Sequence, residues 1–250
     1  VTVDASGVKE YAFRICFNDS YQGTAMANYA LKNMNAKTAA VIMDNSSDYA
    51  KGLAENFTKT FEAGGGKVVA TEAFVAGDTD FNAILTKIKG FEFDVIFIPG
   101  YYNEAGLIIK QARAQGINAP ILGADGFGAP ELVDLAGADA LRDVYFSAHF
   151  SSLDKDPSVM GFIESFKAKY GKEPDQFAAL GYDLAMFVAD GIKRAGSTDT
   201  VAIKDALAAT KDFKGVTGSF SMDENHNPVK AVVVVEIQNG EYVSSERVAQ

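Results

Sequence analysis

Three short segments combine carboxylates with aromatic side chains, and this pairing suits a ligand that carries a positive charge. The first holds Asp48 and Tyr49, the second holds Tyr101 and Tyr102, and the third holds Asp125. A carboxylate accepts a charge-assisted hydrogen bond from an ammonium group, and an aromatic ring supplies an apolar wall beside it. These residue types favour binding of a small polar molecule that bears a cation.

Residues that commonly carry catalysis are scarce. The two histidines, His149 and His226, lie far apart in sequence, and His226 occupies a polar turn where a solvated imidazole is expected. A nucleophilic pair of Cys16 and His149 is conceivable, but no motif supports it. Asp78 and Asp80 are better explained as helix caps than as metal ligands. We therefore predict no enzyme activity, no metal and no cofactor.

The glycine patterns of nucleotide-binding and hydrolase sites are also missing from the sequence. It contains no G-x-S-x-G, no Walker A motif and no G-x-G-x-x-G after a predicted strand. The triple glycine at residues 64–66 follows a helix instead. A flavodoxin-like enzyme, which would bind phosphate at such a loop, is therefore disfavoured.

The composition is that of a globular protein that does not bind nucleic acid. Of its 250 residues, 48% are hydrophobic and 22% are charged, and the formal net charge is −10. A polyanion such as DNA would be repelled on average. The longest apolar runs, such as residues 231–237, fall short of the roughly 20 residues that span a bilayer.

Strand-like and helix-like segments alternate from about residue 37 to residue 128. Short apolar runs predict strands at 39–43, 67–74, 94–98 and 119–123. Amphipathic stretches predict helices at 48–63, 81–89 and 104–115. Apolar strands separated by helices are typical of a parallel α/β sheet that is covered on both faces.

Such a sheet also predicts where a ligand binds. In an open doubly wound sheet, the ligand crevice lies beyond the carboxyl ends of the strands. The loops at that edge are residues 44–49, 76–80, 99–104 and 124–129. They include the segments that combine carboxylates with aromatic rings, so we expect one binding site there.

The second half of the chain follows a different pattern. A strand at 144–150 precedes three successive helices at 157–170, 176–195 and 201–209, with no strand encoded between the helices. Their apolar faces would normally pack on a sheet. The remaining strands are expected at 218–222, 230–237 and 241–247. We therefore expect a second domain whose own sheet is largely missing from this chain.

Several segments along the chain form a recognisable series of motifs. They include FNDSYQG at 17–23, AVIMD at 40–44, GDTDF at 77–81, DVIFIPGYYNE at 94–104, PILGADG at 120–126 and KYGKEP at 169–174. In this order they resemble the motifs of the branched-chain amino-acid-binding proteins, which are type I periplasmic substrate-binding proteins of ABC transporters. The resemblance runs from about residue 8 to about residue 245.

The resemblance implies an α/β fold of two doubly wound parallel-sheet lobes joined by three crossovers, with the first lobe incomplete in this chain. The implied domains are the end of a first-lobe segment at 1–12, a complete second lobe at 13–148, first-lobe helices at 149–228 and returning C-terminal strands at 229–250. The N-terminal part of the first lobe, which normally holds the ligand carboxylate, is absent from the sequence. Either the chain is a fragment, or that part is a second chain, or it lies outside the given residues.

The resemblance also implies roles for individual residues. Tyr49 and Tyr102 match aromatic walls of the family's pocket, and Asp125 matches the residue that accepts the ligand's ammonium group. Phe127 and Phe177 could line the pocket or belong to the core.

Two residues near the first crossover have several expected roles. Tyr21 and Gln22 could belong to the hinge, the pocket rim or a helix start. Glu104, in contrast, is expected in the first turn of its helix, where an anion complements the helix dipole.

The implied function is that of an extracytoplasmic receptor. It would bind a small amino acid of the leucine, isoleucine or valine type in the cleft between the lobes and deliver it to an ABC permease. The expected location is the periplasm, or the cell exterior as an anchored lipoprotein, after removal of a signal peptide. The alternative is a regulatory or chemosensory ligand-binding domain on the same scaffold.

Overall fold

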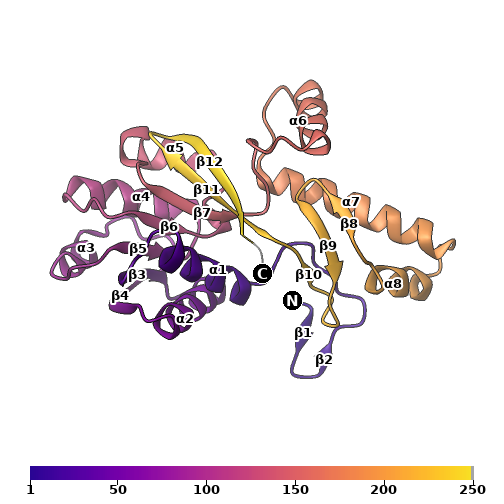
Figure 1. Ribbon diagram of the computed structural model, residues 1–250, viewed down its shortest axis with the longest axis horizontal. Coiled ribbons are helices and arrows are strands. Elements are labelled where there is room, and N and C mark those ends of the chain that lie inside the picture. Colours follow the sequence, from indigo (N-terminus) through magenta and orange to yellow (C-terminus); the bar gives the residue numbers. More distant parts are fainter. Residues whose placement is uncertain (249–250) are drawn as a thin grey trace. The chain divides into compact units, whose positions relative to one another are not determined.

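The computed structural model describes residues 1–248, which form two compact units (Figure 1). Unit 1 comprises Val1–Asn18 and His149–Val232, and unit 2 comprises Asp19–Ala148 and Val233–Val248. Within the described residues the chain therefore passes between the units three times, after Asn18, after Ala148 and after Val232. The three crossovers agree with the predicted fold class.

Unit 2 is built on a seven-stranded sheet. Its strands are β3 (Thr38–Asp44), β4 (Lys67–Phe74), β5 (Val95–Ile98), β6 (Ile121–Gly123), β7 (Val144–Ala148), β11 (Val232–Gln238) and β12 (Glu241–Val248). The strand order is β12-β11-β7-β6-β5-β3-β4. Strands β7, β6, β5, β3 and β4 run parallel, and β11 pairs antiparallel with β7. The predicted parallel sheet is confirmed.

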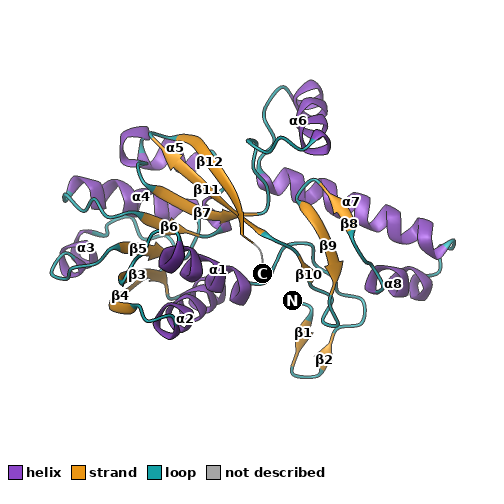
Figure 2. Ribbon diagram, viewed as in Figure 1, coloured by secondary structure: helices purple, strands orange, loops and turns teal. Residues whose placement is uncertain are grey.

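Helices cover both faces of this sheet (Figures 1 and 2). They are α1 (Asp19–Lys32), α2 (Asp48–Ala63), α3 (Asn82–Ile88), α4 (Tyr102–Ala114) and α5 (Glu131–Ala136), with the 3₁₀ turns η1 (Asp125–Phe127) and η2 (Ala138–Ala140). Helices α1 and α2 pack together on one face, and α3, α4 and α5 lie on the other.

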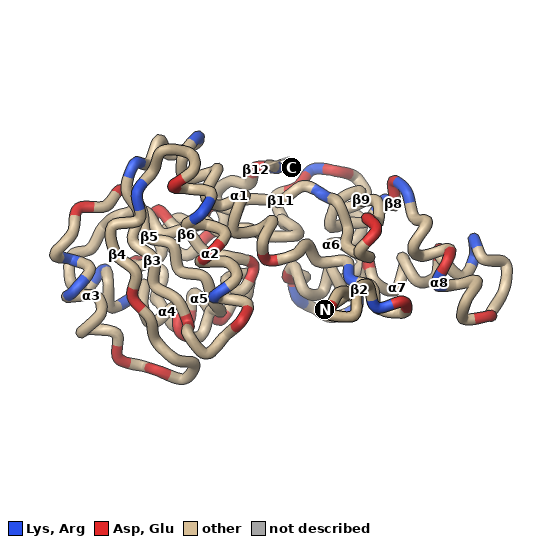
Figure 3. Tube along the Cα trace, turned by 90° about the horizontal axis from the view of Figure 1, so that it is seen from below, with Lys and Arg blue, Asp and Glu red and all other residues tan. Residues whose placement is uncertain are grey.

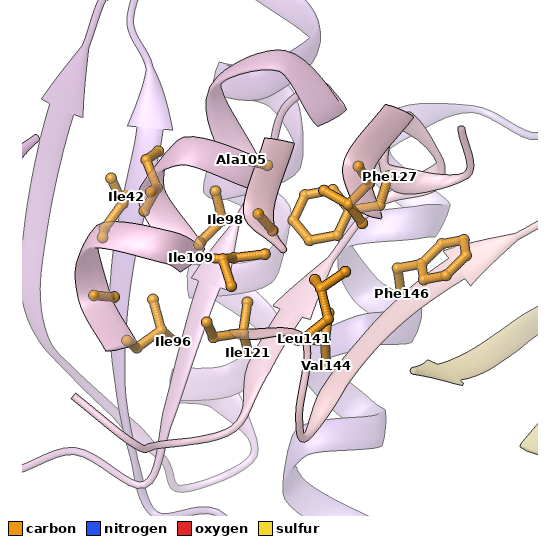
Figure 4. Close-up of a cluster of buried hydrophobic side chains, with 14 of the residues drawn as sticks. Ile42, Ile96, Ile98, Ala105, Ile109, Ile121, Phe127, Leu141, Val144 and Phe146 are labelled. Atoms are coloured by element: carbon orange, nitrogen blue, oxygen red, sulfur yellow. The ribbon is translucent and has the colours of Figure 1, made fainter. Parts of the chain in front are cut away.

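Strand β5 shows why both faces must be covered. Ile96 and Ile98 join the core under α4, as Figure 4 shows, whereas Phe97 stacks on Phe57 of α2 with ring centroids 4.2 Å apart. All four side chains are at most 1% exposed. Because successive strand residues point to opposite faces, an uninterrupted apolar strand requires a layer of helices on each side.

Unit 1 contains two small sheets and three helices. Its strands are β1 (Val3–Asp4), β2 (Gly7–Val8), β8 (Phe213–Gly215), β9 (Gly218–Met222) and β10 (Pro228–Val229). Its helices are α6 (Pro157–Tyr170), α7 (Gln176–Ala195) and α8 (Thr200–Ala208). Each helix begins at an aspartate, Asp156, Asp175 or Asp199, whose side chain accepts a hydrogen bond from a backbone N–H of the first turn.

The units differ from the predicted domains at two boundaries. Residues 13–18 belong to unit 1, because Phe13 stacks on His226 and Ile15 joins a cluster with Phe187 and Phe220. Residues 229–232 also stay in unit 1, where β10 pairs with β9. These long-range contacts leave no local signal in the sequence. Of the segment expected at 229–250, residues 249 and 250 lie outside the described residues.

Helix α7 exposes apolar side chains along much of its length. Its residues Ala179, Phe187 and Gly191 are buried, whereas Leu184 and Ile192 are 46% and 40% exposed. An apolar helix of this kind normally packs on more than one neighbour. Among residues 1–248, no helix combines the length and apolar character needed to cross a membrane.

Acidic and basic residues are interspersed along both units, as Figure 3 shows. The excess of Asp and Glu over Lys and Arg is therefore spread over the described residues.

Candidate functional site

A carboxylate and two tyrosines meet at the carboxyl edge of the unit 2 sheet. Tyr49 lies in the first turn of α2 after β3, Tyr101 caps α4 after β5, and Asp125 begins η1 after β6. The Tyr49 hydroxyl donates a hydrogen bond to the Asp125 carboxylate and accepts one from the Gly126 N–H at 3.3 Å. Two segments of the predicted site are thus directly joined.

Tyr101 completes the aromatic part of the cluster. Its ring stacks on that of Tyr49, with centroids 5.1 Å apart and an interplanar angle of 28°. The side chain is 49% exposed, which is unusual for so large an aromatic residue next to a buried strand. An exposed ring beside a carboxylate offers a ligand both an apolar surface and an anionic partner.

The cluster carries the negative charge of the Asp125 carboxylate. Burial, followed by the nearby Asp125 carboxylate, raises the pKa of the Tyr49 hydroxyl well above its usual value. Burial, Asp125 and Asp19 together raise the pKa of Tyr101. Both hydroxyls therefore keep their protons at neutral pH, and Tyr49 acts as a hydrogen-bond donor to Asp125. The arrangement can attract and orient a cation such as a primary ammonium.

Two glycines allow the segments of the site to approach closely. A Cβ added at Gly126 would lie 2.3 Å from the Gly100 carbonyl oxygen, so η1 touches the loop that carries Tyr101. A Cβ added at Gly23 would lie 2.6 Å from the Leu53 carbonyl oxygen, where α1 crosses α2. No side chain larger than hydrogen fits at either position without a shift of the backbone.

Gln22 lies beneath the cluster and is only 1% exposed. Its Oε1 accepts hydrogen bonds from the Asp125 N–H at 2.7 Å and from the Ser147 hydroxyl at 2.6 Å. The expected roles are the hinge, the pocket rim and a helix start, and Gln22 lies in the first turn of α1. Support of Asp125 is a role that the sequence does not suggest. Tyr21, its neighbour, is a partly buried residue in the first turn of α1.

Tyr102 and Phe127 both contact the hydrophobic core of unit 2. Tyr102 packs against the core under α4, and Phe127 is completely buried in the same core. Tyr102 is the first residue of α4 and lies two helical turns before the buried Ile109, so it faces the sheet. The Phe127 ring fills the space above Gly123. Tyr101, for which no individual role was predicted, is the tyrosine whose ring stacks on Tyr49.

Phe177 and the two histidines belong to unit 1. Phe177 lies in the first turn of α7, in unit 1, and is 45% exposed. His149 is completely buried and stacks on Phe17 with ring centroids 3.8 Å apart. His226 is partly buried, stacks on Phe13, and has its Nδ1 3.0 Å from the Ala12 carbonyl oxygen.

Two further expectations concern acidic residues. Glu104 lies in the first turn of α4, as predicted, and also accepts a hydrogen bond from the Gly77 N–H at 2.9 Å. The expectation that Asp78 and Asp80 cap a helix is wrong, because the N-cap of α3 is Phe81 and no side chain caps it. Asp80 accepts a hydrogen bond from the Asn82 N–H at 3.0 Å, and Asp78 accepts one from the Val75 N–H at 3.0 Å. Within residues 1–248, no group of three or more His, Cys, Asp or Glu side chains is placed to hold a metal ion.

The family model described as periplasmic binding protein matches residues 2–241. The chain belongs to this family. A solved relative is the branched-chain amino acid transporter substrate-binding protein from Streptococcus pneumoniae, described in complex with isoleucine. It is 45% identical with a TM-score of 0.90, and the match covers 96% of this chain and 68% of that one. A leucine-binding protein from Thermotoga maritima is 40% identical with a TM-score of 0.88, over 96% of this chain and 68% of that one.

Relatives known by sequence carry similar names. A Leu/Ile/Val-binding protein homolog from Brucella melitensis is 34% identical over 86% of this chain and 58% of its own length. A leucine-, isoleucine-, valine-, threonine- and alanine-binding protein from Pseudomonas aeruginosa is 32% identical over 85% of this chain and 56% of its own length. The chain therefore spans less than two-thirds of the length of these relatives. Their names describe binding proteins, in agreement with the predicted absence of catalysis.

Proposed function

We propose that this chain is part of an extracytoplasmic solute receptor. It binds a small amino acid of the leucine, isoleucine or valine type and delivers it to an ABC permease. The cluster of Tyr49, Tyr101 and Asp125 carries the proposal, because it offers a carboxylate for the ligand's ammonium group beside apolar rings. The names of the relatives support the ligand class.

In this mechanism each residue has a defined task. Asp125 accepts hydrogen bonds from the ammonium group, and Tyr49 holds that carboxylate in place through its hydroxyl. The exposed Tyr101 ring covers the ligand and excludes water, which strengthens the charge-assisted bonds.

Calorimetric titration with leucine, followed by isoleucine, valine, alanine and threonine, tests the ligand class. We expect one-to-one binding with a negative heat-capacity change. Asp125→Asn keeps the shape but removes the charge, and it should weaken leucine binding at least tenfold. The control Asp134→Asn changes an exposed carboxylate on α5 and should leave the affinity unchanged. Equal affinities of Asp125→Asn and the unmodified protein would overturn the proposal.

A second pair of variants decides which tyrosine contacts the ligand. Tyr101→Leu should weaken leucine binding severalfold, because it removes the ring that stacks on Tyr49. Tyr102→Leu should leave the affinity unchanged, because leucine can keep the apolar contacts of a residue that packs against the core. The reverse result would restore Tyr102 to the pocket.

We also propose that α6, α7 and α8 pack on a segment outside this chain, which holds the ligand's carboxylate. The exposed Leu184, Val188 and Ile192 support this, because these apolar residues lie four apart on one stripe of α7. Sedimentation of the 250-residue chain tests it. We expect self-association, relieved by Leu184→Lys together with Val188→Lys, whereas a monomeric unmodified chain would contradict the proposal.

A further inference from the structure

We propose that Gln22 is a positioning residue that fixes Asp125. Through Gln22, ligand binding at Asp125 affects β7, the strand after which the chain leaves unit 2. The ligand part of this inference rests on the proposed function, whereas the link between Gln22, Asp125 and Ser147 rests on geometry alone. Gln22 acts through Asp125 and does not itself touch the ligand.

A single oxygen atom of the Gln22 side chain joins Asp125 to Ser147. Gln22 Oε1 accepts from the Asp125 N–H at 2.7 Å and from the Ser147 hydroxyl at 2.6 Å. An amide carbonyl has two lone pairs, and here both are used. Gln22 and Ser147 are 1% and 0% exposed, so water is not at hand to replace either bond. If Gln22 follows a displacement of the Asp125 backbone, the bond to Ser147 therefore changes as well.

Ser147 lies close to the point at which the chain leaves unit 2. Ser147 is the second-last residue of β7, and the chain passes into unit 1 after Ala148. Ala148 pairs with Val233, the residue at which the chain re-enters unit 2. Gln22 itself lies three residues after Asp19, where unit 2 begins. The Gln22 side chain thus connects the candidate site with β7, one residue before the chain leaves unit 2.

Helix α1 is held in a position that makes this connection possible. Gly23, next to Gln22, lies where α1 crosses α2, and an added Cβ would be 2.6 Å from the Leu53 carbonyl oxygen. Gln22 is therefore fixed between the helix that carries Tyr49 and the strand that carries Ser147. A firmly placed side chain can pass a small shift of η1 to β7 instead of absorbing it.

The test compares Gln22→Met with a matched control. Methionine has a similar length but accepts no comparable hydrogen bond, so Gln22→Met should weaken leucine binding about tenfold. The control Gln111→Met removes a glutamine of α4 whose Oε1 also accepts a backbone N–H, that of Phe81 at 2.8 Å. The hydrogen-bond partners of Gln111 are the Phe81 N–H and the Thr79 carbonyl, just before α3, and its replacement should leave the affinity unchanged.

A double-mutant cycle separates positioning from general destabilisation. If Gln22 acts through Asp125, then Gln22→Met should change the affinity less than twofold in the Asp125→Asn background. Additive losses from the two substitutions would overturn the positioning role. The cycle needs measurable binding, so a complementary measurement is made without ligand.

Amide hydrogen exchange provides that measurement. In the ligand-free protein, Gln22→Met should speed exchange of the Asp125 amide at least tenfold, whereas unchanged exchange would overturn the link even if leucine does not bind. In the unmodified protein, leucine should slow exchange at residues 147–149, and Gln22→Met should abolish this effect. Slowing that persists in the variant would overturn the transmission. Failure of the proposed function appears separately, as absence of leucine binding in the unmodified protein.

Discussion

Helices α2 and α7 are both amphipathic, but their apolar side chains differ in how far they are buried. In α2, Leu53, Phe57 and Phe61 are completely buried against the sheet of unit 2. In α7, Leu184, Met186 and Ile192 remain 40–47% exposed within the described residues. The same kind of sequence pattern therefore yields a closed core in unit 2 and an open apolar face in unit 1.

This difference shows where the stability of the chain is concentrated. Apolar surface stabilises a fold only when it is removed from water, at roughly 25 cal/mol per Å². Unit 2 has a sheet between two layers of helices, whereas the longest strand of unit 1 has five residues. We therefore expect substitutions in unit 2 to cost more free energy than matched substitutions in unit 1.

The largest expected difference is between Phe97→Ala and Leu184→Ala. Phe97 is completely buried and stacked on Phe57, so its truncation should lower the free energy of unfolding by about 3–5 kcal/mol. Leu184 is 46% exposed, and its truncation should cost less than about 1 kcal/mol. Urea denaturation followed by circular dichroism measures both. Similar costs would mean that the α7 face is buried in solution by association.

Arginines offer a second matched pair. Arg113 of unit 2 is 9% exposed and donates to four backbone carbonyls, those of Ile117, Ala119, Ala140 and Arg142. Burial, and to a smaller extent the nearby charge of Arg142, lowers its pKa to about 10. Arg113→Met should cost about 2–3 kcal/mol, because buried carbonyls lose charged donors.

The control for this experiment is Arg194→Met in unit 1. The Arg194 side chain is 36% exposed, pairs with Asp190 at 2.7 Å, and also donates to the Ala206 carbonyl and the Thr210 hydroxyl. Exposed ion pairs contribute about 0–1 kcal/mol, and only one carbonyl loses a donor here, so the loss should be smaller than for Arg113→Met. A larger loss for Arg194→Met than for Arg113→Met would reverse the ranking of the two units.

Much of the fold could be predicted from local sequence signals. The bounds predicted for α2, β4, α6 and α7 agree with the structure, because apolar periodicity and capping residues mark both ends of these elements. Helix α4 begins at Tyr102 and not at residue 104, since the backbone of Tyr101 is extended. The boundary near residue 19 depends on Phe13 and Ile15, whose partners lie about 170–210 residues away. Such contacts have no local signal.

The candidate site was predictable only in part. The sheet topology and the family resemblance selected Tyr49 and Asp125, and the structure joins their side chains. The choice between Tyr101 and Tyr102 depends on the register of α4, which the spacing of Tyr102 to Ile109 could have indicated. The role of Gln22 depends on hydrogen bonds across 103 and 125 residues of sequence, which no motif reveals.

Glycine substitutions sharpen the comparison because the expected effects have opposite signs. Gly23→Ala in unit 2 would place a Cβ 2.6 Å from a backbone oxygen and should destabilise by about 1–3 kcal/mol. Gly181→Ala in α7 meets nothing within 4 Å and should stabilise by about 0.5–1 kcal/mol, because alanine restricts the unfolded chain. Thermal denaturation should show a lower Tm for the first variant and a higher Tm for the second. A stabilising Gly23→Ala would contradict the tight crossing of α1 and α2.

The smallest effect concerns the pH dependence of the unit 2 sheet. Asp94 accepts backbone N–H bonds from Lys37 at 2.7 Å and Thr38 at 2.9 Å, and these bonds lower the pKa of its carboxyl group. A carboxyl whose pKa is lower in the folded state stabilises the fold above its unfolded pKa of about 3.9, and this stabilisation is lost as the pH falls through the folded pKa. Asp94→Asn should therefore cost stability at pH 7 and progressively less below about pH 4. Urea midpoints of both proteins from pH 7 to pH 2.5 measure this convergence, and a constant difference would show that the two N–H bonds do not depend on the charge.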